Sequence, residues 1–137
     1  NFIRLNKVIM LPNNAPLRLE KVTIIILGDG AVGKTSLAIR YQYKRFPTEY
    51  VPTVFDDYRD ANAKFLGRAL CLQLLDTAGT KELENALIFG YAIAHVALIC
   101  FSIVSRSSFK AVRFRWAVDV DQNSPNDTPI IIVGLKT

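Results

Sequence analysis

Gly28-Asp-Gly-Ala-Val-Gly33-Lys34-Thr35 is the stretch that decides the fold of this chain. It follows an apolar run over residues 22–27 and opens a segment with helical spacing. Two glycines separated by four residues and followed by Lys-Thr form the phosphate-binding loop pattern, which gains weight when a strand precedes it and a helix follows. The glycines let successive backbone N–H groups point into one concavity, and the following helix adds the positive end of its dipole. We therefore predict a phosphate site here rather than an ordinary glycine turn.

A second motif, which contains an acidic residue, lies further along the chain. Asp76-Thr-Ala-Gly79 follows the apolar run over residues 70–75. An acidic residue at a strand tip beside a phosphate loop suits Mg²⁺, usually through a water, and Lys34 and Thr35 are the residues that reach the phosphates and the metal in such loops. Asp-x-x-Gly alone is a common turn, but its place after a phosphate loop and an apolar strand favours a nucleotide site.

The length, composition and charge of the chain limit the classes of protein to which it can belong. The chain has 137 residues, of which 50% are hydrophobic, so it is one domain at most, with enough apolar residues for a real core. No apolar run approaches the ~18 residues of a membrane span. The net charge of +5 is consistent with a solvated basic surface or with a cationic face toward an anionic membrane. We expect no nucleic-acid partner, because the sequence shows no recognisable nucleic-acid-binding motif and no segment in which aromatic and basic residues alternate.

The single histidine and the two cysteines indicate structural roles. Cys71 and Cys100 both lie inside apolar runs, which is typical of small core residues in a reduced, cytoplasmic protein rather than of a disulfide or metal pair. His95 precedes an apolar run and has no Asp or Cys partner at a recognisable spacing. We expect it to be a surface or partly buried structural residue.

Apolar runs alternate with amphipathic segments along the chain. We predict a flexible N-terminal extension over residues 1–20, in which residues 2–11 could dock elsewhere, and one domain over residues 21–137. The patterns predict strands at 22–27, 55–65, 70–75, 96–101 and 130–133, and helices at 34–43, at 81–91 and after a cap at Ser105 or Ser107. The last helix has an aromatic and apolar stripe that we assign to the core, formed by Phe109, Val112, Trp116 and Val120. Continuous apolar strands between helices predict an α/β fold with a mostly parallel sheet covered on both faces.

Further motifs resemble one known family. Tyr50-Val-Pro-Thr53-Val-Phe-Asp-Asp-Tyr58, together with Phe46-Pro-Thr-Glu49, resembles the first switch of Rho-type small GTPases, a branch of the Ras superfamily. Leu98-Ile-Cys-Phe-Ser102, Ser107-Ser-Phe109 and Pro129-Ile-Ile-Ile-Val-Gly134 resemble the same branch. The likeness spans about residues 22–136. It implies the P-loop NTPase fold of small GTPases, with sheet order 2-3-1-4-5-6 and one antiparallel strand pair, here lacking the last strand and helix.

The resemblance also implies cofactors and site residues. The cofactors are GTP or GDP and Mg²⁺. Phe46 would pack against the guanine base, Thr53 would sense the γ-phosphate, and a side chain at Gly30 would crowd the transition state. The implied nucleotide-binding residues are Gly28, Asp29, Gly30, Ala31, Val32, Gly33, Lys34, Thr35, Ser36, Phe46, Thr53, Asp76, Gly79 and Lys136, and the implied metal ligands are Thr35 and Thr53.

The chain departs from the family at three places: at Thr80, over residues 81–90, which share little with the family's second switch, and in the base-reading motif. Thr80 stands where the family has the glutamine that orients the attacking water, so we expect the catalytic positions Gly79 and Thr80 to support only slow GTP hydrolysis. Glu82 could substitute, but a solvated helix residue is the better interpretation. In the base-reading motif Leu135 replaces a polar residue, Lys136 is retained, and the sequence ends before the aspartate. As it stands, we expect the chain to discriminate weakly between GTP and ATP, and to be an unstable fragment with an exposed apolar edge at residues 130–133.

These patterns lead to one main functional hypothesis and two rivals. The main one is a Rho-like small GTPase, a guanine-nucleotide-dependent signalling switch of the cytoskeletal type. It would bind effectors through residues Val51–Tyr58 and meet exchange and activating proteins. Membrane association is expected only if a longer chain carries a lipid anchor. The rivals are a pseudo-GTPase interaction module, favoured by Thr80 and Leu135, and a phosphate-loop kinase or ATPase, disfavoured by the Rho-like first switch.

Overall fold

The structure is a computed structural model of the chain, and it describes residues 20–49, 55–78, 84–125 and 127–136. The N-terminal extension expected over residues 1–20 lies outside this part except for Glu20, which begins the first strand. In chain order the elements are β1 (Glu20–Leu27), α1 (Lys34–Tyr43), β2 (Phe55–Phe65), β3 (Arg68–Thr77), α2 (Glu84–Ile93), β4 (Val96–Ser102), α3 (Arg106–Ala111), the π-helical turn η2 (Val112–Trp116), α4 (Ala117–Asn123) and β5 (Ile130–Leu135).

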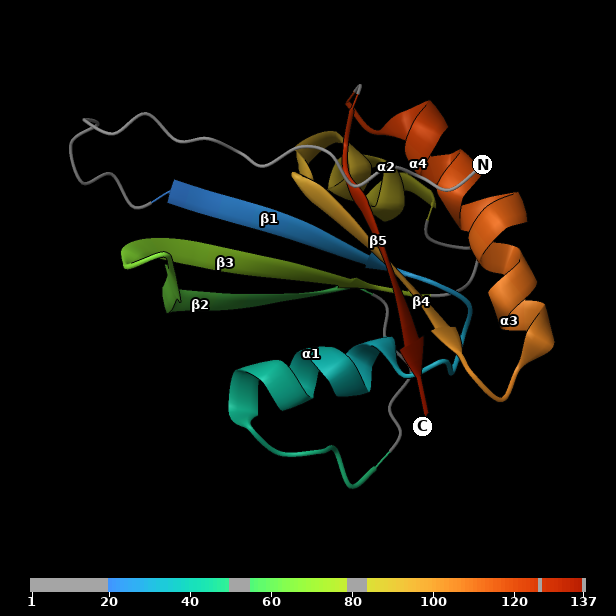
Figure 1. Cartoon of the computed structure of the whole chain (residues 1–137), viewed down its shortest axis with the longest axis horizontal. Coiled ribbons are helices and arrows are strands. Elements are labelled where there is room, and N and C mark those ends of the chain that lie inside the picture. The colour runs from blue at the N-terminus through green and yellow to red at the C-terminus, as the bar shows by residue number, and fades with distance from the viewer. Residues whose placement is uncertain (1–19, 50–54, 79–83, 126, 137) are drawn as a thin grey trace.

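The described strands form one sheet in the order β2-β3-β1-β4-β5 (Figure 1). β1 pairs in parallel with β3 and β4, β4 pairs in parallel with β5, and β2 pairs antiparallel with β3. The expected order and the single antiparallel pair are therefore confirmed. β1 lies at the centre, and its residues 24–27 form a continuous apolar run, which suits a strand that is covered on both faces.

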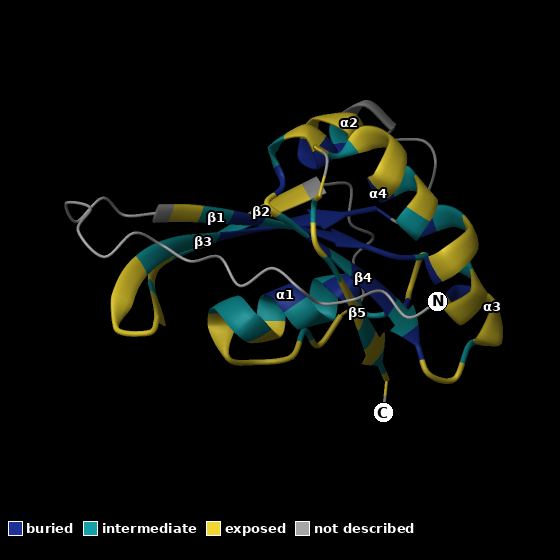
Figure 2. Cartoon of the chain, turned by 45° about the horizontal axis from the view of Figure 1, so that its top comes forward, coloured by how far each residue is buried: buried dark blue, intermediate teal, exposed yellow. Residues whose placement is uncertain are grey.

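The apolar core is divided between the two faces of the sheet. On one face Ile25 and Leu27 pack with residues of α2, η2 and α4, and on the other face Ile26 packs with Val32 and with Ala38 of α1. Side chains alternate between faces along a strand, so one apolar run supplies both layers. Figure 2 shows α1 on one side of the sheet and α2 and α4 on the other. The expectation of helices on both faces is confirmed.

The helical segment after β4 confirms one prediction and corrects another. Ser105 is the N-cap of α3, and its side chain accepts a hydrogen bond from the backbone N–H of Ser108. Val112, Trp116 and Val120 are buried as predicted, but Phe109 is 57% exposed. The position facing the sheet is taken by Ser108, because its hydroxyl accepts from the N–H of Ser102 and thereby satisfies a buried backbone group. The ring of Phe109 instead lies edge-on to Phe101 at the margin of the core, with ring centroids 5.0 Å apart.

The two cysteines and His95 hold structural positions, but only Cys100 is buried in the core as expected, whereas Cys71 is half-buried. Cys71 and Cys100 are free, and they lie on β3 and β4, which β1 separates. Burial raises the pKa of the Cys100 thiol to about 12. His95 exchanges two hydrogen bonds with Thr23: its Nδ1 accepts from the Thr23 N–H at 2.9 Å, and its own N–H donates to the Thr23 carbonyl at 2.8 Å. It thereby ties the start of β4 to the central strand.

Two further observations concern the surface. At one edge of the described sheet, Ile131 and Ile132 of β5 are 44% and 49% exposed. Among the described helices, none combines the length and the apolar character needed to cross a membrane. The instability expected for the chain stays a prediction.

Candidate functional site

The loop between β1 and α1 has a backbone shape that depends on glycine. Gly28 has φ +138° and Gly33 has φ +111°, both in the left-handed region, and Ala31 also has a positive φ of 58°. A Cβ added at Gly28 would lie 2.2 Å from the Cys100 carbonyl oxygen, which belongs to the backbone of β4. Only glycine fits this position, because a side chain would meet both the backbone strain and the overlap.

The start of α1 offers donors to an anion. Gly33 occupies the N-cap, and no side-chain cap bond is formed there. The first N–H groups of a helix have no partner within the helix, and they carry the positive end of its dipole. Thr35 and Ser36 lie in this first turn and are half-buried. The loop and the helix start therefore form a donor-rich surface of the kind that binds phosphate.

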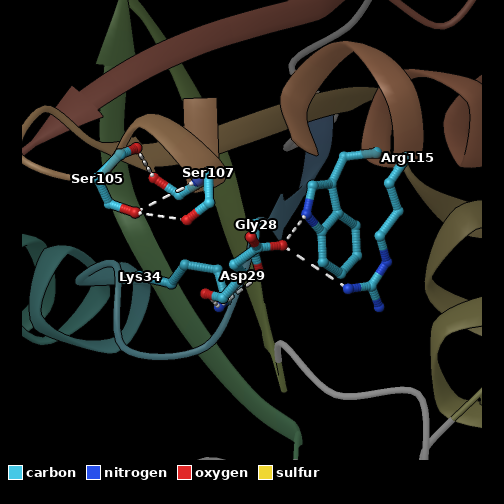
Figure 3. Close-up of polar contacts among 8 residues, drawn as sticks. Gly28, Asp29, Lys34, Ser105, Ser107 and Arg115 are labelled. Carbon is cyan, nitrogen blue, oxygen red and sulfur yellow. Dashed lines mark hydrogen bonds and ion pairs between the residues drawn. The ribbon is translucent and has the colours of Figure 1, made fainter. Parts of the chain in front are cut away.

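Lys34 is the charged residue at the centre of this loop. The residue is only 5% exposed, and its Nζ donates to the carbonyls of Gly28 and Asp29, each at 2.8 Å. Burial lowers the pKa of Lys34 from its ordinary value, and the nearby carboxylate of Asp76 opposes that shift. The amine thus lies inside the loop, held by the backbone that would surround a phosphate (Figure 3).

The end of β3 brings an acidic residue to the same place. Asp76 is fully buried and pairs with Ile26 near the end of β1. The next residue, Thr77, donates its hydroxyl to the Ile26 carbonyl at 2.7 Å. Parallel pairing aligns the ends of the two strands, so it is the sheet register that sets Asp76 beside the phosphate loop.

The C-terminal end of β5 also approaches the loop. Leu135 Cδ1 would lie 3.5 Å from a Cβ built on Gly33, and Lys136 follows with a left-handed φ of 63°. Phe46 lies away from this group on the segment after α1: it is 69% exposed, and the Arg40 guanidinium lies 5.6 Å from its ring centroid. The structure thus brings the loop, Asp76 and the Leu135–Lys136 region together, and it shows Phe46 open to solvent.

Four predicted site positions lie outside the described residues. They are Thr53 in the first switch and Gly79, Thr80 and Glu82 after β3. Their expected roles stay predictions.

One set of contacts was missed by sequence reasoning. The Trp116 indole N–H donates to Asp29 Oδ1 at 2.8 Å, and Arg115 Nη1 lies 3.7 Å from the same oxygen (Figure 3). Arg115 also lies over the Trp116 ring, with Cζ 4.1 Å from the ring centroid. The only available signal was a lone tryptophan preceded by arginine on a helical stripe, and nothing in the sequence pointed from there to Asp29.

Comparison with known proteins now decides the family. A model of the Ras family matches residues 23–137. The chain belongs to the Ras family. It is also 44% identical over 116 residues to the Rho-related protein racE of Dictyostelium discoideum, an alignment that covers 85% of this chain and 51% of that protein. The chain therefore spans about half the length of this relative, and the Rho-type resemblance of its motifs is supported.

Ras-family membership permits a direct test of whether the described residues fit the family's cofactors. Ras-family proteins in general bind a guanine nucleotide and Mg²⁺. The open side of Gly30, where no described atom lies within 4 Å of an added Cβ, leaves room in the loop. The Thr35 hydroxyl and the Asp76 carboxylate are hard oxygen donors of the type that Mg²⁺ prefers. Lys34 and the helix start supply positive charge for phosphates, so the described residues fit both the nucleotide and the metal.

Proposed function

We propose that this chain is a Rho-like small GTPase domain that acts as a guanine-nucleotide-dependent switch in signalling. The observation that carries the proposal is the buried Lys34, whose Nζ lies 2.8 Å from two carbonyls of a loop shaped to surround phosphates. Lys34 would contact the β- and γ-phosphates, Thr35 and Thr53 would ligate Mg²⁺, and Asp76 would support the metal. The metal would neutralise phosphate charge.

The switching role rests on two segments that contact the γ-phosphate in such sites. Thr53 belongs to the first, over residues 51–58, and Gly79 to the second. Both would be held when the γ-phosphate is bound and released when it is lost. We further propose that Val51–Tyr58 is the effector surface and that exchange and activating proteins act on the domain. The two free thiols, on strands that β1 separates, favour a cytoplasmic location.

Hydrogen exchange tests the switch. We expect the amides of residues 51–58 to exchange more slowly when the protein holds a non-hydrolysable GTP analogue than when it holds GDP, because the γ-phosphate orders Thr53. Residues 96–101 of β4 serve as the internal control and should exchange equally in both states. Equal exchange of residues 51–58 in the two states would contradict the switch.

Hydrolysis should be slow because of Thr80. A threonine side chain is too short to orient the attacking water from the glutamine position. We expect Thr80→Gln to raise single-turnover phosphate release from bound GTP by about 10-fold or more. Glu82→Gln is the control, because Glu82 is expected to be solvated. If wild type and Thr80→Gln release phosphate at equal and readily measurable rates, another group positions the water and the slow-switch proposal is wrong.

The pseudo-GTPase alternative is favoured by Thr80 and by Leu135 in the base-reading motif. It predicts little GTP hydrolysis in wild type and in Thr80→Gln alike, so the substitution would not restore hydrolysis. The same measurement therefore separates a slow enzyme from an interaction module.

A further inference from the structure

Asp29 connects the phosphate loop to two different parts of the fold. Its backbone carbonyl accepts from Lys34 Nζ at 2.8 Å, inside the loop. Its side chain turns the other way, and Oδ1 accepts from Trp116 Nε1 at 2.8 Å (Figure 3). One residue thus ties the amine at the centre of the loop to the helical segment that covers the sheet.

The donor side of this contact is fixed in position. Trp116 is fully buried in the core cluster with Val112 and Val120. A buried indole N–H needs an acceptor, because leaving it without one costs about 1–3 kcal/mol. Asp29 supplies that acceptor with a charged oxygen, which makes the hydrogen bond stronger than one between neutral groups.

Arg115 completes the group from the neighbouring position. Its guanidinium lies over the Trp116 ring at 4.1 Å and 3.7 Å from Asp29 Oδ1. Both side chains of this ion pair are about one-third exposed, so the pair alone adds little stability. Its charge also reaches the loop: Arg115 lowers the pKa of Lys34, although this effect is smaller than that of burial and than the opposing effect of Asp76.

The π-helical turn explains how Trp116 reaches this position. The buried residues Ser108, Val112, Trp116 and Val120 follow one another at a spacing of four. In an α-helix of 3.6 residues per turn this spacing drifts by about 40° at each step. The wider turn over Val112–Trp116 offsets part of that drift and keeps Trp116 facing both the core and the loop. Single π-helical turns of this kind are frequent at functional sites.

The loop therefore has two anchors on its β1 side. Gly28 lies against the backbone of β4, and Asp29 is held by η2. The residues that follow, Gly30 and Ala31, are exposed. We propose that Trp116 and Arg115 are positioning residues of the nucleotide site. Through Asp29 they hold the phosphate loop in the conformation that binds phosphate, and they thereby slow the dissociation of the nucleotide. This inference rests on the proposed nucleotide binding.

Release of a fluorescent GDP analogue from the Mg²⁺-loaded protein tests the proposal. We expect Asp29→Ala and Trp116→Phe each to speed release about 10-fold, because each removes the same charge-assisted hydrogen bond. The double variant should release no faster than either single variant, since the bond can be lost only once. Asp29→Asn retains an oxygen acceptor and should restore part of the slow release.

Tyr91→Phe is the matched control. Tyr91 is buried in the same core cluster as Trp116, and its hydroxyl has no hydrogen-bond partner among the described residues. This variant removes one polar atom from a core aromatic residue without touching the loop, so release should stay at the wild-type rate. A purely structural role for Trp116 would lower the melting temperature of Trp116→Phe while leaving the release rate unchanged, and that result would overturn the proposal.

A readout without nucleotide separates this inference from the proposed function. In the nucleotide-free protein, the amides of residues 28–33 should exchange faster in Asp29→Ala and Trp116→Phe than in wild type. Trp116 is the only tryptophan of the chain, so a change of its emission in Asp29→Ala reports the lost contact directly. If wild type fails to bind GDP but the differences in amide exchange and tryptophan emission are present, the positioning role is supported and the proposed nucleotide function is wrong. If exchange and emission are both unchanged, the positioning role is wrong.

Discussion

Gly28→Ala should unfold or severely destabilise the protein. The new Cβ would lie 2.2 Å from the backbone oxygen of Cys100, and the backbone φ of +138° disfavours any side chain. Cys100 pairs with Val133 in the parallel pair of β4 and β5, so its oxygen cannot move away without disturbing that pair. Strain and overpacking together should cost roughly 3–5 kcal/mol. Thermal unfolding should show a midpoint lower by roughly 10–20 °C.

Gly30→Ala is the matched control from the same loop. No described atom lies within 4 Å of its added Cβ, and φ of Gly30 lies outside the left-handed region. Its unfolding free energy should change by less than about 0.5–1 kcal/mol. Equal melting temperatures for the two variants would show that the close approach of Gly28 to β4 is not what fixes the loop.

Much of the fold could be predicted because its signals are local. The predicted strand at 55–65 and helix at 34–43 have the same bounds in the structure as in the sequence analysis. In both cases the spacing of apolar residues, and the glycine or proline residues that flank the element, agree with the packing in the structure. The predicted sheet order was correct because it came from the family resemblance. The order of strands in a sheet cannot be inferred from hydrophobic periodicity.

The remaining features depend on contacts between distant residues. Asp29 and Trp116 are 87 positions apart, and no spacing rule links an acidic loop residue to a tryptophan so far along the chain. The error at Phe109 has a similar origin. Its place in the apolar stripe was inferred from spacing alone, whereas the hydrogen bond between Ser108 and Ser102 decides which residue faces the sheet.

Lys34→Ala should weaken nucleotide binding by at least ~10-fold. A charge-assisted contact of this kind is worth about 1.5–3 kcal/mol, and the loop offers no second buried lysine among the described residues. Lys64→Ala on β2 is the control, because it removes the same charge from an exposed strand position. Thermal unfolding of both variants should accompany the titration, since Lys34 also donates to two loop carbonyls.

The most direct test of the nucleotide site is a titration of the wild-type protein with a fluorescent GDP analogue, with Mg²⁺ and again after chelation of Mg²⁺. We expect saturable binding of about one nucleotide per chain that weakens strongly when the metal is removed. We also expect Lys64→Ala to bind as wild type does and Lys34→Ala to bind more weakly. A protein that melts cooperatively yet shows no saturable binding, or binds equally well with Lys34 replaced, would contradict the assignment of the loop around Lys34 as a nucleotide site.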